Sequence, residues 1–113
     1  MIRYFKSTLI FSFFSILISN VILVPQDYTD IQSAINVSME NDTIMVSPGT
    51  YMENININNH SIFLISTEGP INTIINGNFN GSVINIDSPG NHVEINGFTI
   101  QHGIGELLSS GSR

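Results

Sequence analysis

The chain has 113 residues, enough for one modest domain, and contains no cysteine. The lack of cysteine excludes a disulfide-stabilised scaffold, a thiolate zinc site and a cysteine nucleophile. Hydrophobic residues make up 42% of the chain and charged residues only 11%, a balance that excludes an acidic disordered tail. Nine acidic residues stand against three basic ones, which are Arg3, Lys6 and Arg113. Because Arg113 is the only cation after Lys6, we expect no nucleic-acid partner.

The segment 1–20 has the pattern of a secretory signal peptide. Arg3 and Lys6 precede a mostly apolar run from Thr8 to Val24, TLIFSFFSILISNVILV. A short basic region before such a run is typical of a signal peptide, and we expect cleavage after Ser19 or Asn20. A retained membrane anchor is the alternative, although this run is at the short end of what spans a bilayer. In both cases, we expect the remaining chain to be secreted or exposed at the cell surface.

One short amphipathic helix is expected next, from about Asp30 to Ser38. Thr29 and Gln32 match a capping box, with Thr29 as the N-cap residue. The negative charge of Asp30 in the first turn is favourable for the helix dipole. Apolar residues then follow on one face at helical spacing: Ile31, Ala34 and Ile35.

The sequence after this helix predicts short strands separated by turns. Each apolar, β-branched run is brief and is followed by Asn, Gly, Pro or Ser. We expect strands at Thr43–Val46, Ile55–Ile57, Ile62–Ile65, Thr73–Ile75, Val83–Ile86, Val93–Ile95 and Phe98–Ile100.

The turns recur at a nearly constant spacing along the chain. Ile75-Asn76-Gly77, for example, recurs as Ile95-Asn96-Gly97. A period of roughly twenty, made only of strands and turns, is typical of a solenoid and leaves no room for crossover helices. We therefore expect an all-β parallel β-helix of about three rungs, with Asn76 and Asn96 one rung apart at the same corner.

Residues 24–103 also carry motifs of a known class of proteins. These are YTDIQSAI from Tyr28 to Ile35, DTIMVSPGTYMENI from Asp42 to Ile55, and GPINTIING from Gly69 to Gly77. On these motifs, the chain resembles the N-terminal segment of right-handed parallel β-helix proteins of the pectin-lyase-like superfamily. The resemblance implies that residues 24–103 form the N-terminal cap and first rungs, with the short helix covering the first rung.

Residues 104–113, IGELLSSGSR, depart from the family pattern. Family members normally continue for many more rungs, and a β-helix exposes unpaired backbone groups at each end. We therefore expect this tail to be truncated and the chain to be a segment of a longer protein. Its open end would then be covered by the missing C-terminal rungs or by self-association.

The family resemblance implies no catalytic residues within this chain. Lyases of the superfamily use Arg or Lys as the base, and the methylesterases use an Asp pair, an Arg and Gln residues that come later than this segment. The hydrolases carry Asp-rich motifs and a Gly-His-Gly-like motif, which Gln101-His102-Gly103 resembles, but the Asp-Asp partner is missing. We expect His102 to be an exposed corner residue.

No metal or cofactor site is expected either. Asp87 and Glu94 are the best carboxylate pair and could hold Ca²⁺ together with Asn oxygens. A solvated acidic face is the interpretation we favour for these two, and equally for Asp42, Glu53 and Glu68. The three histidines lack the spacing of a zinc site; they are His60, His92 and His102.

Two functional classes remain. The first is a non-catalytic β-helix segment that acts as a structural or glycan-binding scaffold. The second is the N-terminal part of a polysaccharide-active enzyme, a lyase, esterase or glycosidase, whose catalytic rungs are absent. An acidic chain would repel anionic polysaccharide unless Ca²⁺ bridged them, so a neutral extracellular polysaccharide is the expected partner. Tyr28 and Tyr51 could stack on sugars, but we expect them to pack within the fold.

Overall fold

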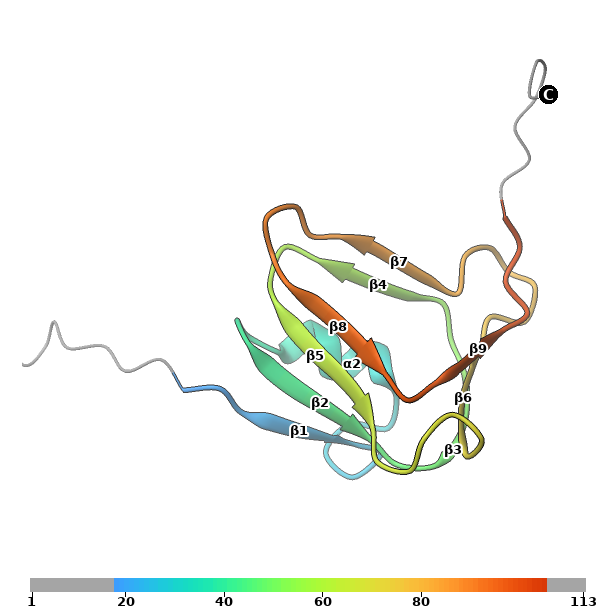
Figure 1. Ribbon diagram of the computed structural model, residues 1–113, viewed down its shortest axis with the longest axis horizontal. Coiled ribbons are helices and arrows are strands. Elements are labelled where there is room, and N and C mark those ends of the chain that lie inside the picture. Colours follow the sequence, from blue (N-terminus) through green and yellow to red (C-terminus); the bar gives the residue numbers. More distant parts are fainter. Residues whose placement is uncertain (1–17, 106–113) are drawn as a thin grey trace, which may run out of the picture.

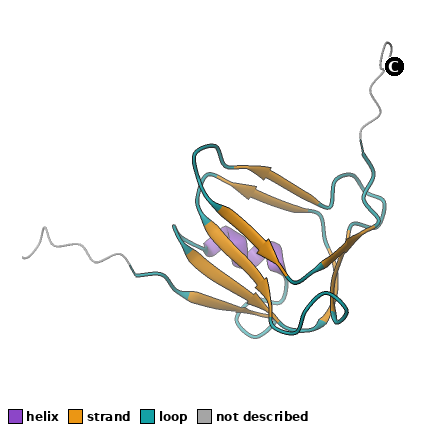
Figure 2. Ribbon diagram, viewed as in Figure 1, coloured by secondary structure: helices purple, strands orange, loops and turns teal. Residues whose placement is uncertain are grey.

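The computed structural model describes residues 18–105, so the predictions for residues 1–17 and 106–113 lie outside it. Figure 2 shows that strands and turns make up nearly all of the described chain. The elements are β1 (Val21–Val24), α2 (Ile31–Val37), β2 (Asp42–Val46), β3 (Gly49–Met52), β4 (Ile55–Asn58), β5 (Ile62–Ser66), β6 (Thr73–Asn76), β7 (Ile84–Asp87), β8 (Val93–Asn96) and β9 (Thr99–Gln101). The expected all-β character agrees with this content, apart from the one short helix.

The strands form three sheets, and every pairing is parallel. The sheet orders are β1-β2-β5-β8, β3-β6-β9 and β4-β7 (Figure 1). The chain visits the three sheets in turn: β2, β3 and β4 form one pass, β5, β6 and β7 the next, and β8 and β9 follow. Each strand of a pass therefore pairs with its counterpart in the preceding pass.

The predicted constant period is wrong. Asp42 pairs with Ile62, close to the expected spacing, but Ile62 pairs with Val93, which lies much further along the chain. Asn76 and Asn96 also do not share a corner, because Asn76 ends β6 while Asn96 ends β8 in a different sheet. The loops between strands differ in length and absorb the extra residues, so the recurring Asn-Gly pairs mark turns at different corners.

Two strands were missed from the sequence. The residues of β1 belong to the apolar run that follows Arg3 and Lys6, but in the structure they pair with β2 along the whole strand. The residues of β3, GTYM, lack an apolar run, and their burial alternates only between half-buried and exposed. Both strands form because a neighbouring strand supplies backbone hydrogen-bond partners. This stabilisation cannot be predicted from the local amino-acid composition.

Helix α2 has the expected position but a different cap. The N-cap residue is Asp30, whose Oδ1 accepts from the Ser33 N–H at 2.8 Å. The Glu53 carboxylate adds a second cap, since it accepts from the N–H groups of Ile31 and Gln32, each at 2.9 Å. The prediction that Thr29 is the N-cap is therefore wrong; both side chains bonded to the helix N-terminus are carboxylates, which the positive end of the helix favours.

The core lies between the three sheets and α2. Side chains alternate along each strand, and the inward residues stack from one pass to the next. The helix packs against β1, β2 and β4 through its buried face. The fully or nearly fully buried apolar residues are Val24, Ile31, Ala34, Ile35, Ile44, Val46, Ile55, Ile57, Ile62, Leu64, Ile75 and Val83.

At the α2 end, local groups occupy part of the edges of β1 and β4. The Leu23 N–H of β1 donates to Asp27 Oδ2 at 2.9 Å, and the Leu23 carbonyl accepts from the Asp27 N–H at 2.8 Å. On β4, the Gln32 side chain accepts from the Asn56 N–H at 2.7 Å and donates to the Asn56 carbonyl at 3.1 Å. The Gln32 amide thus bonds the β4 edge as a neighbouring strand would.

The opposite end, formed by β7, β8 and β9, is open; each of these strands lies at the edge of its sheet. Ile86 pairs with Ile57, which is fully buried, yet Ile86 itself is 49% exposed. Ile100 pairs with Ile75 in the same way and is also 49% exposed. These side chains share the inward register of the core but have no further layer over them within the described part of the chain.

Candidate functional site

The structure does not bring Asp87 and Glu94 into one cluster. Asp87 ends β7 and is exposed, whereas Glu94 lies in β8 of a different sheet. The Glu94 carboxylate lies 3.8 Å from His92 Nε2. Within residues 18–105, no group of three or more His, Asp or Glu side chains is arranged to hold a metal ion.

The three histidines lie at separate places with separate partners. His60 Nε2 lies 2.9 Å from Ser38 Oγ, and His102 Nδ1 lies 3.1 Å from Asn76 Oδ1. His92 is the partner of Glu94 and packs its ring near Phe63, with centroids 5.6 Å apart.

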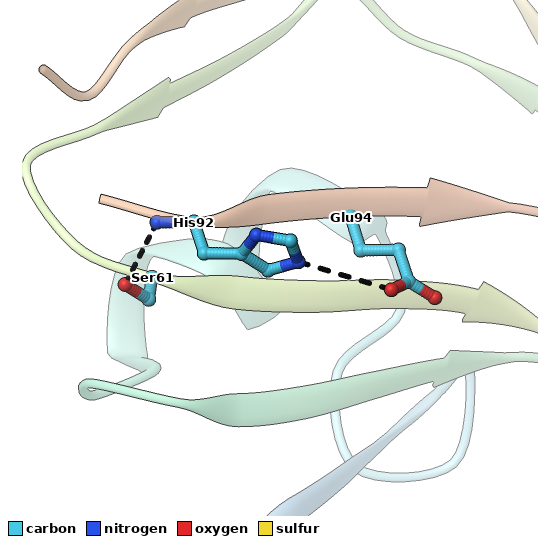
Figure 3. Close-up of polar contacts among 3 residues, drawn as sticks. All are labelled: Ser61, His92 and Glu94. Carbon is cyan, nitrogen blue, oxygen red and sulfur yellow. Dashed lines mark hydrogen bonds and ion pairs between the residues drawn. The ribbon is translucent and has the colours of Figure 1, made fainter. Parts of the chain in front are cut away.

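Ser61, His92 and Glu94 have the composition of a catalytic triad but not its geometry (Figure 3). Ser61 is only 6% exposed, and its Oγ accepts from the backbone N–H of His92 at 3.0 Å. The imidazole extends away from this hydroxyl toward Glu94. Because the His92 imidazole does not contact the hydroxyl, these three residues do not form a serine–histidine–carboxylate relay.

Several acidic residues have structural partners. Asp42 is 2% exposed, and its carboxylate accepts from the Asn20 and Met39 N–H groups, each at 2.8 Å. Together with the cap formed by Glu53, this corrects the prediction of a solvated face for both residues; Glu68 is exposed as expected. Residues 18–105 contain no Lys or Arg, so these carboxylates are compensated by backbone N–H groups.

Two further carboxylates are stabilised in the charged form by such bonds. The hydrogen bond from the Ser33 backbone lowers the pKa of Asp30 below its ordinary value of 3.8. Hydrogen bonds from the side chain and backbone of Ser61 lower the pKa of Glu40 below its ordinary value of 4.5. Both groups hold loop or helix ends in place, which indicates a role in folding.

The best candidate binding surface is the outer side of the β4–β7 sheet. Asn56 and Asn58 of β4 lie in register with Asn85 and Asp87 of β7, and all four are exposed. The Asn85 amide approaches Asn56 Oδ1 at 3.4 Å. We call these four residues the amide face; three of its side chains are neutral amides that can both donate and accept hydrogen bonds.

A hollow of about 380 Å³ adjoins the amide face. It lies between β4 and the exposed side of α2, and is lined by Gln32, Ile35, Asn36, Asn56, Asn58 and His60. The Gln32 amide is fixed by Asn36 Oδ1 at 2.9 Å as well as by the β4 backbone. The hollow therefore has polar walls of defined geometry.

Asp87 is among the candidate residues predicted from the sequence, but its neighbours on the amide face are not, although a signal was present; these are Asn56, Asn58 and Asn85. ININ in β4 and INID in β7 alternate isoleucine with a polar residue. Alternation of this kind places the isoleucines inward and the amides outward. What the sequence did not reveal was that the two segments pair with each other, with Ile55 opposite Ile84.

Comparison with protein-family models, with curated proteins and with solved structures gives no match to this chain. Among residues 18–105, no helix has the length and apolar character needed to cross a membrane.

Proposed function

We propose that the chain is a non-catalytic β-helix segment that binds a neutral polysaccharide on its amide face. The observation that carries this proposal is the register of the amide face, which presents neighbouring amides on two parallel strands beside a polar hollow. Amides match the hydroxyl groups of sugars because both kinds of group donate and accept. The acidic balance of the chain disfavours anionic polysaccharides.

The solenoid part of the proposal rests on the order in which the chain visits its sheets. Two successive passes run through the same three sheets in the same order, with parallel pairing throughout. Stacking of repeated passes, each in contact only with its neighbours, is what a solenoid requires. The pectin-lyase-like motifs in residues 24–103 favour the right-handed form.

We further propose that the mature chain lies outside the cytoplasm, because Arg3, Lys6 and the following apolar run have the pattern of a signal peptide. The open end would be covered by further rungs or by a second copy. Light scattering of the purified chain distinguishes the two: a monomer argues against the second copy. Further rungs would also be the place for the catalytic residues of the alternative, a polysaccharide-active enzyme.

Binding can be tested by titrating neutral cello-, xylo- and manno-oligosaccharides into the purified protein in a calorimeter. We expect the double variant Asn56→Asp, Asn85→Asp to weaken binding by about tenfold or more, because two amide donors are replaced by carboxylates. Asn96→Asp is the matched control, since it makes an exposed asparagine acidic on a different sheet. Equal affinities for all three proteins, or no binding of any oligosaccharide, would contradict the proposed function.

A further inference from the structure

The loop between β6 and β7 displays an aromatic side chain that the core does not use. Phe79 is 60% exposed and has a backbone φ of 57°. A positive φ is rare and unfavourable for a bulky residue. Because the ring is exposed, it also lacks the stabilisation that burial of a large apolar side chain provides. Stability of the fold alone therefore does not account for the exposed ring and the positive φ of Phe79.

This conformation is fixed by one bond to the next pass of the chain and by two bonds within the loop. The Phe79 N–H donates to the His102 carbonyl at 2.7 Å, and the Asn80 N–H donates to the Gly77 carbonyl at 3.0 Å. Asn76 Oδ1 accepts from the Asn78 N–H at 2.9 Å. The loop is thus held at several points along its length.

The ring of His102 extends the aromatic surface. The Phe79 and His102 ring centroids are 4.5 Å apart, with 31° between the ring planes, which is within the range of a favourable aromatic pair. His102 Nδ1 lies 3.1 Å from Asn76 Oδ1, so the same amide that holds the loop also orients the imidazole. We call these two rings the aromatic shelf.

The chemistry around the aromatic shelf indicates its ligand. Exposed asparagines, Asn78 and Asn80, flank Phe79 in the sequence, and residues 18–105 supply no Lys or Arg that would favour an anion. An aromatic ring beside neutral hydrogen-bonding groups matches a pyranose, which has an apolar C–H face and a rim of hydroxyls. The loop also leads directly into β7, which carries half of the amide face.

We propose that the aromatic shelf is a stacking subsite for one sugar ring of the same neutral polysaccharide. This inference rests on the proposed function and extends its site from the amide face to the adjacent corner. It assigns Phe79 as the stacking ring and His102 as the residue that supports it from the next pass.

The test uses Phe79→Asn, which removes the ring while asparagine tolerates the positive φ. Phe79→Tyr is the conservative control, because it keeps the ring. With the tightest-binding oligosaccharide of the panel, we expect Phe79→Asn to weaken binding by about tenfold and Phe79→Tyr to stay within about twofold of wild type. In two-dimensional NMR spectra, the Phe79 and His102 ring signals should shift on titration.

The outcomes separate the two proposals. Wild-type affinity for Phe79→Asn, together with weakened binding by the amide-face variant, would overturn the aromatic shelf and leave the proposed function in place. No binding by the wild-type protein would overturn both. A Phe79→Asn variant that loses self-association in light scattering, with unchanged sugar binding, would show that the shelf is a contact between copies and would overturn the inference.

Discussion

The two ends of the stacked sheets use the same inward residues in opposite ways. At one end, α2 covers β1, β2 and β4, and local groups occupy the backbone edges of Leu23 and Asn56. At the other end, β7 and β9 leave half-exposed isoleucines, Ile86 and Ile100, in register with buried ones. The difference shows that the burial of an inward side chain depends on whether another layer covers it. The same alternating pattern gives buried residues in one pass and half-exposed residues in the next.

The largest difference in stability between the two layers is expected for substitutions at the paired residues Ile57 and Ile86. Ile57→Ala should lower the free energy of unfolding by about 2–5 kcal/mol, because it leaves a cavity among fully buried neighbours. Ile86→Ala, at the paired position, should cost less than about 1 kcal/mol because that side chain is already half in water. Urea denaturation followed by circular dichroism measures both.

If Ile57→Ala does not fold, the pair Ile57→Val and Ile86→Val gives the same comparison at a smaller scale. Equal losses at the two positions would contradict an open end in solution and would show that another layer covers β7.

A second, smaller effect is expected at the closed end from Asp42. Asp42→Asn should lower the free energy of unfolding by about 1–3 kcal/mol, because an amide cannot accept from both N–H groups that the buried carboxylate binds. Glu68→Gln is the control, since that side chain is exposed and should change stability by less than about 0.5 kcal/mol. Thermal unfolding of both variants tests this; equal melting temperatures would contradict a structural role for Asp42.

The smallest expected effect is on the pH dependence of the free energy of unfolding. The folded-state pKa values of Asp30 and Glu40 lie below 3.8 and 4.5, respectively, so their hydrogen bonds stabilise the fold above these values. The free energy of unfolding should therefore not depend on these groups from pH 7 to about 5, and should fall as the pH decreases through the folded-state pKa values. The double variant Asp30→Asn, Glu40→Gln should show a weaker fall below about pH 5 in urea titrations. A fall as steep as that of the wild type would exclude these two residues as its cause.

The alternation of isoleucine with polar residues predicted most strands and their inward faces. The positions of Ile55, Ile57 and Ile84 follow from composition and period alone, because each strand is short and bounded by turn residues. The pairing register of the strands could not be predicted from the sequence, because it depends on loop lengths that vary from corner to corner. Asn76 and Asn96 illustrate this, since identical Ile-Asn-Gly segments end strands of different sheets.

The polar contacts were harder to predict than the strands. Glu53 bonds to the start of α2, and Asp42 bonds to the backbone of Asn20, each across a long stretch of sequence. These separations follow from the stacking of passes, which brings together residues that no local motif links. The aromatic shelf was missed for the same reason, because Phe79 and His102 come from different passes.

The Gln32 side chain on the edge of β4 has a consequence for polymerisation. Stacked sheets with two free ends can add subunits head to tail without limit, which yields fibres. Here the amide of Gln32 and the carboxylate of Asp27 occupy backbone groups on the edges of β4 and β1 that another chain would need for strand pairing. Copies that meet through β7, β8 and β9 would bury each other's open end, and the occupied edges of β1 and β4 would then disfavour the addition of further copies.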